Sequence, residues 1–377
     1  MLFAFSTPPP GVLNGKLRAG FSGFWFFGAV KQMSEELNER SRKILEAIIE
    51  DYIDSAEPIG SRAMTRRHPL GLSPATVRNV MADLEEMGYI ISPHTSAGRV
   101  PTDKGYRFYI DSLLQVRQLS QQEQQRIQQH HHLKGLRMDE LLREAGKILS
   151  RISHYTGIVM APRFTATVFR HIEFIRLSRG RILVVFVSDT GLVQNKIIET
   201  TEELSPGELE QMSSYLNQTL TGMTIQQAKA RIVEEMAQEK ALYDNLLQRA
   251  LQLSREALQE ESEGEVFIEG AANIFEQPEC ADLERMKRLF RTFEQKGLLV
   301  ELLDKSQKAD GVQIFIGNEN EYREIEGCSL VTATYSSRRG TIGTLGVIGP
   351  VRMPYSTVIP VVDYTARLVS QMLESES

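Results

Sequence analysis

The stretch that decides the fold is Leu72–Gly88, which reads LSPATVRNVMADLEEMG. It predicts a helix over Pro74–Met87, because Ser73 can cap the first turn with its hydroxyl and proline suits the first helical position. Gly88 is the residue type expected just past a helix C-terminus, where the backbone often turns left-handed. Apolar residues recur at helical spacing and give the helix one buried face: Val77, Val80, Met81, Leu84 and Met87.

The opposite face of this helix carries small and hydrogen-bonding side chains: Ala75, Thr76, Arg78, Asn79 and Ala82. Such side chains suit a helix that enters a DNA major groove, because Arg can bind guanine and Asn can bind adenine through two hydrogen bonds each. The alternative is an ordinary amphipathic helix, since exposed Arg and Asn are common on protein surfaces. The flanking sequence favours the first interpretation.

Two further helices are predicted upstream. The first has an apolar face and ends before Pro58; that face is formed by Ile44, Leu45, Ile48, Tyr52 and Ile53. Ser61 is expected to cap a short second helix, which is rich in arginine and carries Arg62, Arg66 and Arg67. A tight connection through residues 69–71 then leads into the third helix. Helix, short helix, turn and capped helix is the order of a helix-turn-helix, in which the last helix reads bases.

A β-hairpin is predicted directly after the third helix. Residues 89–91 read as a strand, the turn formers of residues 92–98 follow, and Arg99-Val100 return as a second strand that Pro101 ends. A hairpin in this position is a wing. Arg99 lies close to its tip, where it is well placed to reach a phosphate or a narrow minor groove.

Residues 73–85 and 93–109 carry a resemblance to a known family. The first segment is similar to the recognition-helix signature of the bacterial heat-inducible transcription repressor HrcA, and the second is similar to that family's wing and the start of its next helix. The similarity runs from about Glu39 to the C-terminus. It implies an inverted-repeat element ahead of heat-shock chaperone operons as the operator, and the chaperonin GroEL as a partner that helps the repressor reach its active form. A closed two-fold dimer would place two identical reading helices on such a repeat.

We therefore expect eleven residues to form the DNA-binding site. Thr76, Arg78 and Asn79 are expected to contact bases, and Ala75 is expected to lie against a base edge. The others are expected to position the backbone or the wing: Arg62, Arg66, Ser73, His94, Ser96, Gly98 and Arg99.

The charge distribution agrees with a local DNA-binding patch. The chain has 377 residues and a formal net charge of -6, yet the segment 62–107 holds seven basic and four acidic residues, so it is +3 and the remainder is -9. Phosphate contacts dominate DNA affinity, so a basic patch and an acidic effector half are expected of such a binder. The two cysteines, Cys280 and Cys328, fit a reducing, cytoplasmic compartment and no structural disulfide.

The remaining sequence predicts an α+β, multidomain protein. A helix capped by Thr102 follows the wing, and residues 118–129 are a linker or a solvated helix. Further helices are expected at 138–152, 205–220, 224–258, 282–297 (stopped by Gly297) and 358–373, and strands at 156–161, 168–177, 182–187, 192–199, 266–268, 313–316, 328–334 and 343–348. We expect a winged helix-turn-helix domain over 33–114. The resemblance implies a GAF-like α/β sensor domain over 115–164 and 263–377, with an inserted α+β dimerisation module at 165–262.

Residues 1–32 lie outside this organisation. The apolar run at 21–30 is too short to span a bilayer, which needs about 20 residues. Lys16 and Arg18 precede it, as they would in a signal peptide. The interpretation we prefer is that the true start is Met33 and that the extension is non-native or disordered, so no membrane association is expected.

No pattern of catalytic or cofactor-binding residues stands out. The glycine-rich segment 340–346 lacks the Lys-Ser/Thr of a phosphate loop and opens a strand. The histidines at 130–132 cannot converge on one metal ion from a helix, where neighbouring side chains point apart. We expect a protein that is not an enzyme and that has no cofactor or metal. The alternative function is a small-molecule-responsive transcription regulator that senses a ligand in its GAF-like domain.

Overall fold

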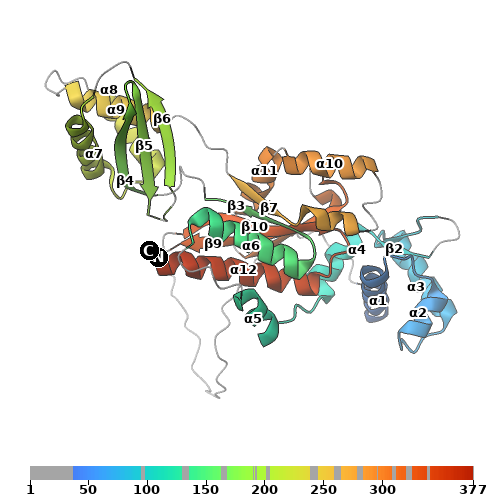
Figure 1. The fold of residues 1–377 in the computed structure, drawn as a ribbon. Coiled ribbons are helices and arrows are strands. Elements are labelled where there is room, and N and C mark those ends of the chain that lie inside the picture. Colours follow the sequence, from blue (N-terminus) through green and yellow to red (C-terminus); the bar gives the residue numbers. More distant parts are fainter. Residues whose placement is uncertain are drawn as a thin grey trace, which may run out of the picture.

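The computed structural model describes residues 37–94, 98–129, 136–162, 168–189, 191, 193–200, 204–237, 245–258, 265–277, 283–294, 296–307, 311–319, 325–337 and 340–376. Figure 1 shows three bodies along the chain, which we call the head, the core and the module. The head and the module lie at opposite ends of the core. The fold is mixed helix and sheet, as the sequence predicts.

The head is a winged helix-turn-helix. Its elements are α1 (Glu39–Ser55), α2 (Ser61–Arg67), α3 (Pro74–Glu86), β1 (Ile90–Ile91), β2 (Val100–Pro101), α4 (Asp103–Phe108) and the π-helical turn η1 (Tyr109–Leu113). Strands β1 and β2 pair antiparallel, with Ile90 opposite Pro101 and Ile91 opposite Val100. The predicted apolar face of α3 is confirmed, since Val77 and Leu84 are fully buried, and Val80 and Met81 are nearly so.

One detail of the head differs from the sequence-based expectation. Helix α2 begins at Ser61, and its N-cap is Gly60, which makes no side-chain cap. The carbonyl of Gly60 accepts from the N–H groups of Ala63 and Met64, both at 3.0 Å, so the turn closes without the serine hydroxyl. Pro101 is the last residue of β2, so the predicted end of this strand is confirmed.

The core is a five-stranded antiparallel sheet of order β7-β3-β10-β9-β8. Its strands are β3 (Thr156–Met160), β7 (Val266–Glu269), β8 (Val312–Phe315), β9 (Cys328–Ser337) and β10 (Gly340–Pro350). One face packs on α6 (Met138–Ser153) and α12 (Tyr355–Glu376), and the other packs on α10 (Leu283–Glu294) and α11 (Lys296–Gln307). Two short 3-10 turns, η3 (Ala271–Glu276) and η5 (Gly317–Glu319), complete the core. Helix α5 (Gln121–Gln129) follows the head along the chain and lies below α12 in Figure 1, so the described part of the glutamine-rich segment is a helix.

The module leaves and re-enters the core between two adjacent strands. Strand β3 ends at Met160, which lies opposite Val266 at the start of β7, so the chain departs and returns at neighbouring positions. Between them lie strands β4 (Phe169–Ser178), β5 (Arg181–Ser188) and β6 (Val193–Glu199), then helices α7 (Pro206–Leu220), α8 (Ile225–Ala237) and α9 (Asn245–Leu258). The apolar residues of these elements form a cluster of their own.

The helix expected over 224–258 corresponds to α8 and α9, and residues 238–244 between them lie outside the described part of the chain. One sequence-based helix boundary was wrong. Gly297 does not stop a helix but lies in the first turn of α11, where backbone N–H groups need no intrahelical partner. Among the described helices, none combines the length and the apolar content that a membrane crossing requires.

Candidate nucleic-acid interface

The exposed face of α3 is divided by charge. In its N-terminal half, Ala75, Arg78 and Asn79 are exposed. In its C-terminal half, the exposed side chains include the acids Asp83 and Glu86. The positive end of the helix dipole also lies at the N-terminus. Only the N-terminal half therefore suits a negatively charged partner, and this half contains the residues expected to contact bases.

Ser73 caps the N-terminal half of α3. Its hydroxyl accepts from the N–H of Thr76 at 3.1 Å and lies 2.9 Å from the Thr76 hydroxyl. Thr76 is half-buried, so its hydroxyl is partly engaged in the cap while Arg78 and Asn79 point outward from the next turn. Pro74 occupies the first helical position, as the sequence predicts.

Helix α2 contributes two exposed arginines, Arg62 and Arg66. The Nε of Arg66 donates to the Arg62 carbonyl at 3.3 Å, and neither guanidinium forms an ion pair within the described residues. The neighbouring Arg67 is different, because its Nη1 lies 3.6 Å from an Asp51 carboxylate oxygen. Arg62 and Arg66 are the better placed of the three for a phosphate.

Glu85 holds the base of the wing from the end of α3. The Nε and Nη2 atoms of Arg99 lie 2.9 and 2.8 Å from Glu85 Oε2, and the N–H of Ser92 donates to Glu85 Oε1 at 3.1 Å. One carboxylate thus ties both strands of the hairpin to the reading helix. A phosphate contact by Arg99 stays a prediction, and it requires the guanidinium to share or leave this carboxylate.

Gly98 lies where the wing meets the backbone of Ile59. Arg99 and Ile59 exchange both backbone hydrogen bonds, at 2.8 and 3.0 Å, so Ile59 adds a third strand position to the hairpin. A Cβ on Gly98 would lie 2.5 Å from the Ile59 carbonyl carbon. His94 is exposed near the wing tip, and its carbonyl accepts from the Ser92 hydroxyl at 2.8 Å. Ser96 lies outside the described residues.

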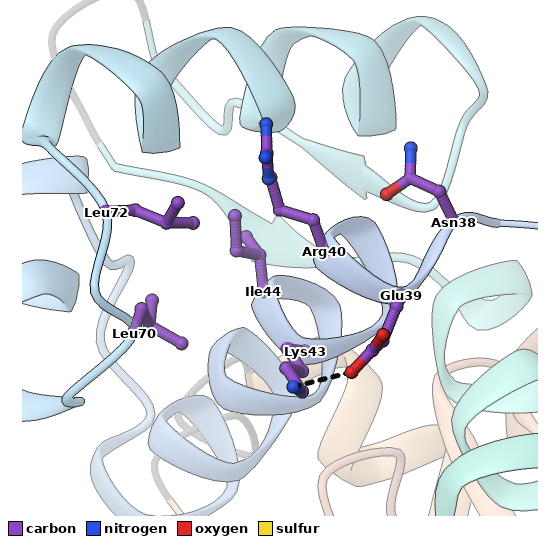
Figure 2. Close-up of a pocket in the computed structure, with 7 residues that line it drawn as sticks. All are labelled: Asn38, Glu39, Arg40, Lys43, Ile44, Leu70 and Leu72. Atoms are coloured by element: carbon purple, nitrogen blue, oxygen red, sulfur yellow. Dashed lines mark hydrogen bonds and ion pairs between the residues drawn. The ribbon is translucent and has the colours of Figure 1, made fainter.

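A shallow groove of about 580 Å³ lies beside the connection that enters α3. Figure 2 shows that the N-terminal turn of α1 forms one wall and that Leu70 and Leu72 form the other. Lys43 is paired with Glu39 at 2.7 Å, whereas Arg40 points away from that pair. Arg40 is an exposed cation that lines the same groove as Leu72, and the sequence-based residue set omitted it.

The described residues contain no group of three His, Cys, Asp or Glu side chains that could hold a metal ion. The histidines at 130–132 fall outside the described residues. Cys328 is a buried cysteine.

Similarity to known proteins extends over most of the chain. The family described as winged helix-turn-helix transcription repressor, HrcA DNA-binding, matches residues 36–113, and the family described as HrcA protein C terminal domain matches residues 139–359. A heat-inducible transcription repressor HrcA of Geobacter sulfurreducens is 59% identical over 341 residues, covering 90% of this chain and 99% of that protein. Its counterpart in Syntrophobacter fumaroxidans is 43% identical, covering 90% of this chain and 98% of that protein.

A solved structure shares the fold. It is described as a hypothetical protein at 2.2 Å resolution, has a TM-score of 0.62 and 23% identity, and covers 91% of this chain and all of that one. The family matches extend over both the head and the core, and they include the reading helix and the wing. The chain therefore belongs to the HrcA family of heat-inducible transcription repressors.

Proposed function

We propose that this repressor acts in the cytoplasm as a homodimer on an inverted-repeat operator ahead of heat-shock chaperone operons. The observation that carries this proposal is the divided face of α3, which exposes Ala75, Arg78 and Asn79 beside the N-terminal helix dipole. We further propose a domain division into 33–114 for DNA binding, 115–164 and 263–377 for a GAF-like domain, and 165–262 for an inserted dimerisation module. The neighbouring exit and return points at β3 and β7 support the insertion.

An uncovered sheet face in the module supports the homodimer. Helices α7, α8 and α9 pack on the face that carries Phe174, Val184 and Ile198. The side chains that alternate with these point to the other face, which no described element of the chain covers. Its cross-strand rows are Ile175–Leu183–Ile197, Glu173–Val185–Asn195 and His171–Val187–Val193.

The apolar character of this face is unusual for a solvated surface. Ile197 is 53% exposed, Val193 is 48% exposed and Ile175 is 40% exposed. Contiguous exposed apolar patches on soluble proteins mark interaction sites. A second copy is the occupant that fits, since a two-fold axis brings the same rows together and covers both patches at once.

The same face gives a physical role to the GroEL chaperonin, which we propose as a partner. A single chain exposes the apolar rows until a second copy covers them, and exposed apolar surface is what makes incompletely assembled chains prone to aggregate. A chaperonin that shelters such chains would raise the concentration of active dimer. When heat diverts the chaperonin to other clients, the dimer would become scarce and repression would lapse.

A ligand-responsive function is a second candidate, and one observation favours it. The hydroxyls of Thr332 and Thr344 are fully buried and have no hydrogen-bond partner among the described residues. Thr332 lies two residues from Leu330 and Thr344 lies four residues from Ile348, which are both packed on α10 and α11, so the two threonines lie on that face of the sheet. A small polar ligand or a water would satisfy them. Calorimetric titration of candidate metabolites, followed by operator binding, tests this function.

The experiment for the main proposal is an electrophoretic mobility shift with purified full-length protein. Inverted-repeat DNA, a single half-site and scrambled DNA are compared with and without chaperonin and ATP. The proposal expects the inverted repeat to be bound most tightly and the bound fraction to rise with chaperonin. Equal binding to all three DNAs would refute the operator, and an unchanged bound fraction would refute the chaperonin dependence.

A further inference from the structure

Helix α4 is attached to the reading helix on one side. The hydroxyl of Thr102 donates to the Gly88 carbonyl at 2.6 Å, and the Lys104 ammonium donates to the Met87 carbonyl at 2.8 Å. The same ammonium lies 4.6 Å from the centre of the Tyr89 ring. These contacts fall on the C-terminal end of α3 and the start of β1. Any rotation of α4 therefore carries the reading helix with it.

The same short helix is attached to the core through Arg107. Its Nε donates to Glu319 Oε1 at 2.8 Å, and its Nη2 donates to the Ile314 carbonyl at 2.7 Å and to Glu319 Oε2. Glu319 is itself fixed, because its Oε2 accepts from the Ile316 N–H at 2.9 Å. Burial lowers the pKa of Arg107, but the hydrogen bonds and charges of Glu319 and Asp111 outweigh burial and raise it overall. The guanidinium stays charged. A bidentate Arg–carboxylate pair of this kind fixes the relative orientation of the two side chains as well as their distance.

A second contact runs in the opposite direction. The carboxylate of Asp103, the first residue of α4, accepts from the N–H of Asn318 in η5 at 2.9 Å. This close approach requires glycine at position 317, because a Cβ there would lie 2.4 Å from the Asp103 carboxylate. The head thus supplies an arginine to a core carboxylate and a carboxylate to a core N–H. We call this pair of contacts the clasp.

We propose that the clasp, Arg107–Glu319 with Asp103–Asn318, sets the orientation of the reading head on the core and thereby the operator spacing that the dimer accepts. Apolar contacts continue from head to core, and the rings of Tyr106 and Tyr355 lie 6.3 Å apart. Such packing is non-directional, whereas the clasp has a fixed geometry. In a dimer joined through the module, the head lies at the far end of the core, so a small rotation at α4 becomes a large displacement at the DNA.

This inference rests on the proposed dimer and its inverted-repeat operator. Two heads held at a fixed separation fit one spacing between half-sites, because each base pair of added spacing moves and rotates the second half-site. Arg107 and Glu319 are therefore positioning residues, and they do not touch DNA. Their loss should relax the discrimination between spacings without changing the affinity of one head for one half-site.

The test compares wild type with Glu319→Gln and Arg107→Gln, singly and together, in the full-length chain. The affinity is measured by fluorescence anisotropy for a half-site, for the native operator and for operators whose spacer is one or two base pairs longer or shorter. The matched control is Glu284→Gln, which removes a carboxylate paired with Lys287 at 2.9 Å on α10, away from the clasp. Thermal unfolding shows whether each variant keeps its fold.

We expect the preference for the native spacing to fall about tenfold in either single variant. A tenfold change lies within the range of interaction energies measured between residues in direct contact. The double variant should fall little further, the half-site affinity should stay constant, and Glu284→Gln should behave as wild type. An unchanged spacing preference in folded variants would overturn the inference while leaving the operator proposal intact. A parallel loss of half-site affinity would also overturn it. A wild type that ignores spacing and palindromy would refute both.

Discussion

Val193→Asp is expected to weaken the dimer at least about 30-fold while each chain keeps its fold. Val193 is 48% exposed in the single chain, on the uncovered sheet face of the module. Burying an aliphatic side chain completely contributes about 1.5–3 kcal/mol, so covering the remaining half contributes about 1 kcal/mol per copy. A two-fold dimer interface contains Val193 twice, so the two copies together contribute about 2 kcal/mol of binding free energy, or about 30-fold in the dissociation constant.

This magnitude is a lower bound, because aspartate also brings a charge into the seam. Removing a carboxylate from water costs several kcal/mol unless it finds a partner, and the two-fold axis adds a second one nearby. This desolvation cost is small in the single chain, because residue 193 is half exposed to solvent there. Sedimentation velocity over a concentration series measures the dissociation constant, and thermal unfolding at low concentration reports on the fold.

Val233→Asp is the matched control. Val233 is 52% exposed, close to the 48% of Val193, and the substitution is the same, but Val233 lies on α8 and outside the uncovered sheet face. The account expects the control to dimerise as wild type does. If Val193→Asp dimerises normally, or if both variants weaken the dimer equally, the sheet face is not the seam.

Three further predictions concern the head. Arg78→Ala should lose about 1–3 kcal/mol of discrimination at one base position per half-site, measured with operator variants; equal losses on specific and random DNA would mean that Arg78 contacts only phosphate. Arg99→Ala should weaken binding to all sequences and reduce the salt dependence, and an unchanged salt slope would remove Arg99 from the contacts. Gly98→Ala should destabilise the head by about 1–3 kcal/mol in denaturant titrations, because its Cβ meets the Ile59 backbone at 2.5 Å. Gly60→Ala, with no atom within 4 Å of its Cβ, is the control and should be near neutral.

Local signals in the sequence were sufficient for the reading helix. Ser73, Pro74 and Gly88 carry the start and end of α3 in their own backbone chemistry, and the buried face follows from helical spacing. The strands of the module were also predictable, since a continuous β-branched and apolar run at 182–187 lies between two turns and forms β5. These features depend on residues within one element or one turn.

Contacts between distant residues could not be predicted in the same way. The clasp joins residues 212 positions apart, and neither Arg107 nor Glu319 belongs to a motif that points to the other. The pairing of Ile59 with Arg99 was missed because one isolated residue gives no alternating pattern. Gly297 misled the helix boundary because glycine near a first turn and glycine past a last turn look alike in sequence. The uncovered sheet face could not be predicted from the sequence, because it depends on the register of three strands.

The central claim is that two copies of the capped helix α3 read a palindromic operator together. The most direct measurement is the affinity of the folded full-length dimer for its own inverted-repeat promoter and for scrambled DNA of equal length, at one fixed salt concentration. The account predicts that the promoter is bound at least about a thousandfold more tightly, as specific DNA-binding proteins typically achieve. Equal affinity for the two DNAs, from a dimer shown to be folded, would contradict it.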